Sequence, residues 1–203
     1  MAARAPALNP DPMDPHKLQQ GFRLVLEGLG LDDSDPVLKD TARRTAEAWS
    51  RELCVGLVSA EPDLDLMLLE EGQQPGLIAL DSIPVKSVCA HHLLPFIGVA
   101  TVAYVPHGAI CGLSKLSRVV DHFARRPQVQ ERLTHQVAQY LQRHLQPLGV
   151  GVSIQASHFC MDVRGVNHSG LMTTTSLLGS LDKNAALRAE FQALCQNARP
   201  PAL

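Results

Sequence analysis

The chain has 203 residues, which is the size of one domain or of one domain with appendages. Apolar residues make up 45% and charged residues 19% of it, a composition that excludes a chain disordered throughout. The net charge of −2 at pH 7 favours neither nucleic acid nor an anionic membrane as a partner. No apolar run approaches the roughly 20 residues of a membrane span, and residues 1–15 lack the hydrophobic segment of a secretory signal. We therefore expect a soluble, cytoplasmic protein.

The first part of the chain is predicted to be helical after a short arm. Residues 1–15 are proline-rich and show no periodicity, so we expect a disordered arm there. Apolar spacing predicts a short helix over residues 16–31. Residues 33–36, Asp-Ser-Asp-Pro, are typical of a helix start and predict a second amphipathic helix that ends near Gly56. Residues 59–76 are acidic and loop-like.

The second part of the chain alternates between strand and helix patterns. Strands are predicted at 77–87 and 98–105, helices at 114–125 and from Pro127 to about Leu145, strands at 150–156 and 159–163, a strand-like run at 173–176 and a helix at 182–195. Strands, then two helices, then strands again favour an α+β fold with an antiparallel sheet.

Cysteine and histidine gather at two places next to predicted strands. Cys89 and His92 form a Cys-x-x-His pair, and Cys160 lies two residues after His158. Zinc is bound by thiolate and imidazole, and catalytic zinc sites usually have three protein ligands and one open position. Cys89, His92 and Cys160 are therefore candidate ligands, with His91 and His158 beside them as proton carriers. From spacing alone, buried cysteines and metal-free histidines remain an equal alternative.

A second group of polar residues surrounds a predicted helix start. Lys115 and Arg118 are three positions apart and share a helix face. Ser114 lies at the same helix N-terminus, where an anion could bind, and Arg164 belongs to a separate basic segment. From the pattern alone, an ordinary solvated surface is the simpler interpretation of these residues and of Glu131. The chain has no Walker-type or dinucleotide glycine-rich loop and no G-x-S-x-G motif, which excludes the common nucleotide folds and serine hydrolases.

Long stretches of the chain resemble the GTP cyclohydrolase I family. The resemblance is carried, in chain order, by LKDTARRTAEAW, SVCAHHLLPFIGVATVAYVP, ICGLSKLSRVVDHFARRPQVQERLTHQVA, ASHFCMDVRGV and TTTS, which together cover roughly residues 35–180. An ordered series of long motifs is far more specific than one metal-ligand spacing.

This resemblance implies a tunnelling fold (T-fold), an α+β architecture with an antiparallel sheet, two long helices and an N-terminal helical extension. On this basis residues 1–15 are an arm, 16–76 an N-terminal helical region and 77–203 the T-fold catalytic domain. Members of the family are decamers of two stacked pentamers with active sites between subunits. We therefore expect a homo-oligomer, with neither nucleic acid nor membrane as a partner.

The resemblance also implies a reaction and a role for each matching residue. The reaction is the zinc-dependent hydrolysis of GTP to 7,8-dihydroneopterin triphosphate and formate, the first step of folate and pterin biosynthesis. It comprises opening of the purine ring at C8, deformylation, an Amadori rearrangement of the ribose and ring closure. The implied roles are Zn²⁺ binding by Cys89, His92 and Cys160, catalysis by His91 and His158, and substrate binding by Ser114, Lys115, Arg118, Gln130, Glu131 and Arg164.

Two segments depart from the pattern of the family. Ala90 stands where the family usually has glutamate in Cys-Glu-His-His, and residues 167–171 replace a stretch that commonly carries basic residues and a proline. Loss of a residue that orients a metal ligand typically costs about 10–100-fold in affinity or activity. Besides an ordinary cyclohydrolase, two interpretations therefore stay open. One is a diverged paralogue that stops at ring opening or acts on another purine nucleotide, and the other is a non-catalytic oligomeric zinc-binding protein.

Three cysteines have no predicted function. Cys54, Cys111 and Cys195 lie outside the motifs described above. In a chain without a secretory signal, the default expectation for such residues is a buried free thiol.

Overall fold

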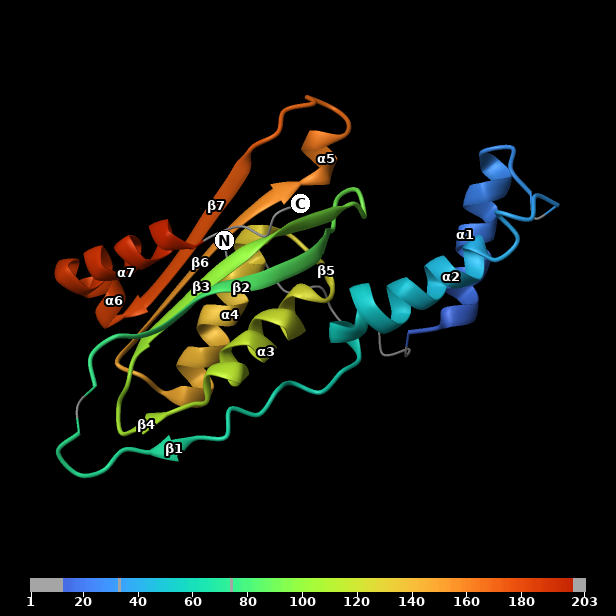
Figure 1. Cartoon of the computed structure of the whole chain (residues 1–203). Helices are drawn as coiled ribbons and strands as arrows, with labels where there is room; N and C mark the ends of the chain where they lie inside the picture. Colours follow the sequence, from blue (N-terminus) through green and yellow to red (C-terminus); the bar gives the residue numbers. More distant parts are fainter. Residues whose placement is uncertain (1–12, 33, 74, 199–203) are drawn as a thin grey trace. The chain divides into compact units, whose positions relative to one another are not determined.

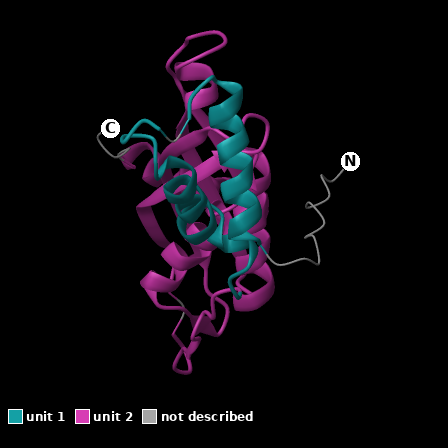
Figure 2. Cartoon of the chain, turned by 90° about the vertical axis from the view of Figure 1, so that its right-hand side faces the viewer, with its two compact units in different colours: residues 1–60 teal, residues 61–203 magenta. Residues whose placement is uncertain are grey.

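The computed structural model describes residues 13–32, 34–73 and 75–198. The chain divides into two compact units, Met1–Ala60 and Glu61–Leu203 (Figure 2). A disordered arm is expected at residues 1–15, and residues 1–12 of it lie outside the described residues. Among the helices that are described, none has both the length and the apolar character needed to cross a bilayer.

The first unit is helical, as predicted. Its elements are α1 (Pro15–Gly28), α2 (Thr41–Ala48), a π-helical turn (Trp49–Leu53) and a 3₁₀ turn (Val55–Leu57). Asp14 caps α1, because its carboxylate accepts the backbone N–H groups of His16 and Lys17. The second helix begins later than the predicted start at 33–36. The Asp35 carboxylate accepts the Val37 N–H at 2.8 Å, and this turn competes with helix.

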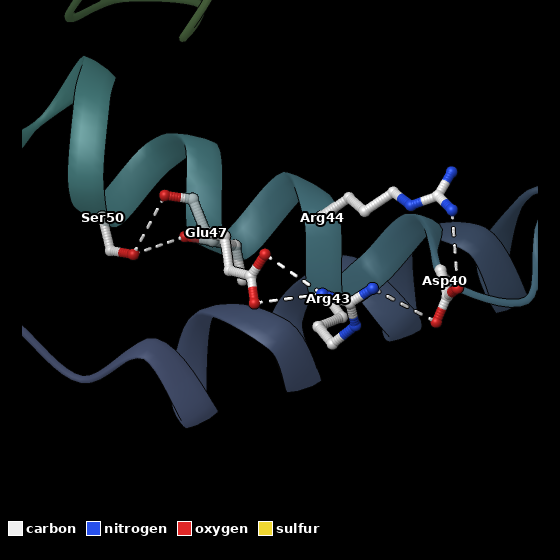
Figure 3. A network of polar contacts seen from close by, with 6 residues as sticks. Asp40, Arg43, Arg44, Glu47 and Ser50 are labelled. Atoms are coloured by element: carbon white, nitrogen blue, oxygen red, sulfur yellow. Dashed lines mark hydrogen bonds and ion pairs between the residues drawn. The ribbon is translucent and has the colours of Figure 1, made fainter.

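Helix α2 separates a buried face from a charged one. Ala42 and Ala46 are buried on one side. On the other side, a ladder of ion pairs and hydrogen bonds runs along the helix and is formed by Asp40, Arg43, Arg44, Glu47 and Ser50 (Figure 3). The pairs are spaced three or four residues apart, as neighbours on a helix surface must be.

The second unit is built on a five-stranded sheet. Its strands are β2 (Ile78–Cys89), β3 (Pro95–Val105), β5 (Pro127–Gln128), β6 (Gly149–His158) and β7 (Leu171–Gly179), in the order β5-β2-β3-β6-β7 (Figure 1). The prediction of a purely antiparallel sheet is wrong at one edge, where β5 runs parallel to β2. The reason is that α3 (Leu113–Ala124) returns the chain to the end of β2, so Pro127 and Gln128 run alongside that end. A small sheet of β1 (Met67–Leu68) and β4 (Ala109–Ile110) was not predicted.

Helices pack on both faces of this sheet. They are α3 (Leu113–Ala124), α4 (Gln130–Leu145), α5 (Phe159–Asp162), α6 (Ser180–Lys183) and α7 (Ala185–Asn197). The main core lies between α3, α4 and the sheet and includes Leu116 and Leu133, both fully buried. On the opposite face, Phe191 of α7 packs with Ala103. A Cβ on Gly151 would lie 2.8 Å from a Leu181 methyl carbon, so glycine allows this close packing.

Two further predictions are wrong, and both concern segments next to the site described below. Residues 159–163 were predicted to continue the sheet but form α5, in which the Val163 N–H donates to the Phe159 carbonyl at 3.2 Å. The second long helix was predicted from Pro127 but begins at Gln130, because Pro127 and Gln128 belong to β5. In both segments the contacts made where the strand ends meet, rather than the local sequence pattern, decide the secondary structure.

Candidate metal centre and active site

Three side chains from two strand ends converge as a metal-ligating group. Cys89 ends β2, His92 lies in the turn after it, and Cys160 lies on α5 directly after β6. Their ligand atoms all lie within 4.8 Å of one another. The sheet register explains this convergence, because Phe96 at the start of β3 pairs with His158 at the end of β6.

The spacing of the two sulfur atoms fits a metal and excludes a disulfide. Cys89 Sγ and Cys160 Sγ are 3.9 Å apart, whereas a disulfide bond is about 2.05 Å long. Two thiolates on a tetrahedral zinc, each about 2.3 Å from the ion, would lie about 3.8 Å apart. Burial, with the charge of Cys89 as a smaller contribution, raises the pKa of Cys160 in the absence of an ion. Two thiolates and one imidazole therefore fit Zn²⁺.

The exposed side of this group is formed by His91, His92 and Arg164. His91 Nδ1 lies 3.9 Å from Cys89 Sγ. Arg164, after α5, donates from Nη1 to His92 Nε2 at 3.2 Å. The family resemblance assigns Arg164 to the substrate, and the structure places it in contact with a candidate metal ligand.

His158 lies on the buried side of the group. Its side chain is 9% exposed, and its ring stacks on Phe96 with centroids 4.7 Å apart and planes 9° from parallel. His158 Nε2 lies 2.8 Å from Gln130 Oε1. Burial lowers the pKa of His158, while the charges of Glu131 and Asp162 act in the opposite direction. A buried imidazole held by Phe96 and Gln130 therefore lies next to the candidate metal ligands.

Gln130 and Glu131, both predicted as substrate residues, have different environments at the start of α4. Gln130 is 1% exposed, and its amide is bonded to two other elements of the fold, β6 and β7. Glu131 is exposed, and its charge acts on His158. Glu131 is therefore free to meet a ligand, whereas the amide of Gln130 is engaged within the protein.

The predicted basic group is not brought to the metal ligands within one chain. Ser114 and Arg118 are exposed on the first half of α3, and Lys115 forms an ion pair with Asp65. The other end of α3 is the one near the metal group, because Gln128, shortly after it, pairs with Cys89. With 12 residues, α3 is about 18 Å long, and the basic group lies at its far end.

Sequence reasoning missed the residues that hold His158 in place. Phe96 stacks on its ring, and Thr174 of β7 and Thr134 of α4 complete the polar network around Gln130. The strand-like Thr173–Ser176 run was noted only as a strand pattern. Nothing in its local sequence indicates a contact with α4.

Comparisons with known proteins identify relatives over most of the chain. The family model described as GTP cyclohydrolase I matches residues 18–196. The GTP cyclohydrolase 1 of Nitrosospira multiformis is 47% identical over 179 residues, covering 87% of this chain and 93% of its own length. The enzymes of Pelotomaculum thermopropionicum and Sulfurihydrogenibium sp. are 45% and 43% identical, and each is matched over 94% of its length. Among solved structures, an archaeosine synthase QueF-Like in the apo form aligns with a TM-score of 0.42 and 19% identity over 51% of this chain.

Proposed function

The chain belongs to the GTP cyclohydrolase I family, and we propose that it hydrolyses GTP to 7,8-dihydroneopterin triphosphate and formate. The observation that carries the proposal is the convergence of Cys89, His92 and Cys160 beside His158. A ligand set for a Lewis acid next to a buried imidazole suits hydrolytic opening of a purine ring. No other described group of cysteine, histidine or carboxylate side chains forms such a cluster.

The two thiolates and His92 would hold Zn²⁺, which would supply a Lewis acid and lower the pKa of water. The residues of the chain have separate roles around it. His158, buried and fixed by Phe96, gives a proton to the purine ring nitrogen as the ring opens. His91, which is exposed, exchanges protons with solvent. Glu131 accepts hydrogen bonds from the N1–H and 2-amino group of guanine.

We propose that the active site is shared between subunits of a T-fold homo-oligomer, a decamer of two pentamers. The basic group of Ser114, Lys115 and Arg118 lies at the far end of α3 from the metal ligands of its own chain. A neighbouring copy could therefore supply these side chains to the triphosphate. In support, β7 pairs with β6 alone among the described strands, which leaves one edge of the sheet open for another copy.

Subunit mixing tests this shared site. A Cys160→Ser chain lacks a metal ligand, and a Lys115→Ala chain lacks a phosphate contact. If the two residues serve the same site from different subunits, mixed oligomers regain part of the activity that neither variant has alone. Light scattering of the wild type gives the subunit count, and a monomer would contradict the proposal.

Metal content and formate release together test the assigned roles. His158→Ala should retain zinc and lose formate release, because His158 handles protons and is not a ligand. Cys160→Ser should lose both zinc and activity. Loss of zinc from His158→Ala would contradict the division of roles.

Ala90 is the position where altered chemistry would arise. It is exposed between Cys89 and His91, and its backbone N–H donates to the Gln128 carbonyl at 2.8 Å. If the missing carboxylate slows the reaction, Ala90→Glu raises turnover with GTP. Unchanged turnover would show that the family's usual glutamate is dispensable here.

A further inference from the structure

The amide of Gln130 is a buried junction between three elements of the fold. Its nitrogen lies 3.0 Å from the Ile154 carbonyl oxygen on β6 and 2.9 Å from the Met172 carbonyl oxygen on β7. It also lies 3.1 Å from Thr174 Oγ1. On its other side, Gln130 Oε1 lies 2.8 Å from His158 Nε2. Gln130 itself is 1% exposed, so water does not compete for these bonds.

Two backbone carbonyls determine which way this amide is turned. The carbonyl oxygens of Ile154 and Met172 only accept hydrogen bonds, so the amide nitrogen must face them. With the amide reversed, its oxygen would lie 3.0 and 2.9 Å from two carbonyl oxygens, and acceptors at such distances repel one another. The orientation of Gln130 therefore follows from its partners.

The neighbouring threonines agree with this orientation. The Thr134 hydroxyl donates to the Gln130 backbone carbonyl at 2.8 Å. Its oxygen then accepts from Thr174 across 2.6 Å, so the Thr174 hydroxyl has no hydrogen left for Gln130, which agrees with the amide nitrogen lying on that side. Each hydroxyl therefore donates one hydrogen bond, Thr174 to Thr134 and Thr134 to the Gln130 carbonyl.

The protonation pattern of His158 follows from the same reasoning. Gln130 Oε1 can only accept, so His158 Nε2 must carry a hydrogen. A neutral imidazole has a single N–H, and Nδ1 then carries the lone pair. The Nε2–H bond is kept when the ring is positively charged, since Nε2 is protonated in both forms. Stacking on Phe96 restrains the ring plane at the same time.

We infer that Gln130 is a positioning residue that holds His158 as the Nε2–H tautomer and leaves Nδ1 as the atom that exchanges a proton with the substrate. The role of Gln130 in catalysis rests on the proposed function, whereas the His158 tautomer follows from the hydrogen bonds alone. In the reaction, the charged His158 gives the Nδ1 proton to the substrate nitrogen and becomes neutral. The proton released by the water that adds to the purine carbon returns to Nδ1 and restores the charged ring. Gln130 thus acts through His158 and is not itself a ligand of the purine.

The tautomer of His158 can be measured without an activity assay. Solid-state NMR of the zinc-loaded full chain with ¹⁵N-labelled histidine at about pH 8, where histidine is neutral, distinguishes the two ring nitrogens. The His158 signals are those missing from His158→Gln. We expect a protonated Nε2 and an unprotonated Nδ1. The opposite tautomer, or a mixture of both, would overturn the inference even if the enzyme is active.

Kinetics of Gln130→Met test the positioning role, with Gln128→Met as the matched control. Gln128 is also a fully buried glutamine, but its amide donates to the Phe123 carbonyl and to Gln136 and does not contact His158. Because general acid–base catalysis contributes at least about 10²-fold, Gln130→Met should lower kcat for formate release by about that factor with KM for GTP unchanged. Gln128→Met should keep both kcat and the His158 signals close to those of the wild type.

The outcomes separate this inference from the proposed function. A raised KM with unchanged kcat in Gln130→Met would make Gln130 a substrate ligand and overturn the positioning role. An equal fall of kcat in both glutamine variants would point to a general packing defect and overturn it too. A wild type that releases no formate would refute the proposed function, while the NMR measurement would still decide the tautomer.

Discussion

Replacing Arg164 by glutamine should tighten zinc binding, although the family resemblance gives Arg164 a role in substrate binding. In the structure its guanidinium donates to His92 Nε2 at 3.2 Å. This bond stabilises the metal-free arrangement of a candidate ligand and places a positive charge where a dication would bind. Both effects weaken metal binding, and Arg164→Gln removes them.

The size of the effect follows from the exposure of the contact. A hydrogen bond contributes about 0.5–1.5 kcal/mol to stability, and an exposed charged contact falls at the lower end of that range. A gain of about 0.5–1 kcal/mol corresponds to zinc binding about two- to fivefold tighter. Arg143→Gln removes the same charge from an exposed site on α4 and serves as the control.

Competition with a chelator of known zinc affinity, on reduced and metal-free protein, measures this difference. We expect Arg164→Gln to retain zinc at higher chelator concentrations than both the wild type and Arg143→Gln. Weaker or unchanged binding would show that the contact between Arg164 and His92 does not compete with the metal.

Three further predictions concern the fold. Burial raises the pKa of Cys54 to about 11, so iodoacetamide at about pH 8 should leave it unlabelled in the native chain; labelling seen by mass spectrometry would refute this. Burial also lowers the pKa of His122 below the usual 6.5, so the unfolded state gains a proton first, and the free energy of unfolding falls as pH drops below about 6.5. In urea titrations this fall should be smaller for His122→Gln. A Cβ on Gly98 would lie 1.9 Å from the Gln155 carbonyl oxygen, so Gly98→Ala should cost about 3 kcal/mol or more, and an unchanged melting temperature would contradict this.

The long regular elements were predictable because local periodicity reports burial. The stripe that predicted the helix after residue 113 is buried in α3, including Leu116 and Val120. In β6 the alternating apolar residues are buried as expected, but their neighbours from Gly149 to Ser153 are buried too, because the strand is covered on both faces. Short segments failed because tertiary pairing decides them. Pro127 and Gln128 form a strand only because the end of β2 is there to pair with them.

The residue types of the site were predictable, but their contacts were not. Zinc chemistry makes Cys89, His92 and Cys160 candidate ligands, with buried cysteines and metal-free histidines as an equal alternative, and the structure brings the three side chains together. By contrast, the contact between Gln130 and His158 joins residues 28 positions apart, and that between Arg164 and His92 joins residues 72 apart. No local pattern reports such pairs, because the sheet register and the start of α4 create them.

One measurement tests the central claim most directly. Zinc-loaded protein is incubated with GTP, and formate is quantified alongside the ultraviolet absorbance of the pterin product. We predict that formate and pterin appear together in equal amounts. Neither product with zinc bound, or formate without a pterin, would contradict the proposal that this chain completes the cyclohydrolase reaction.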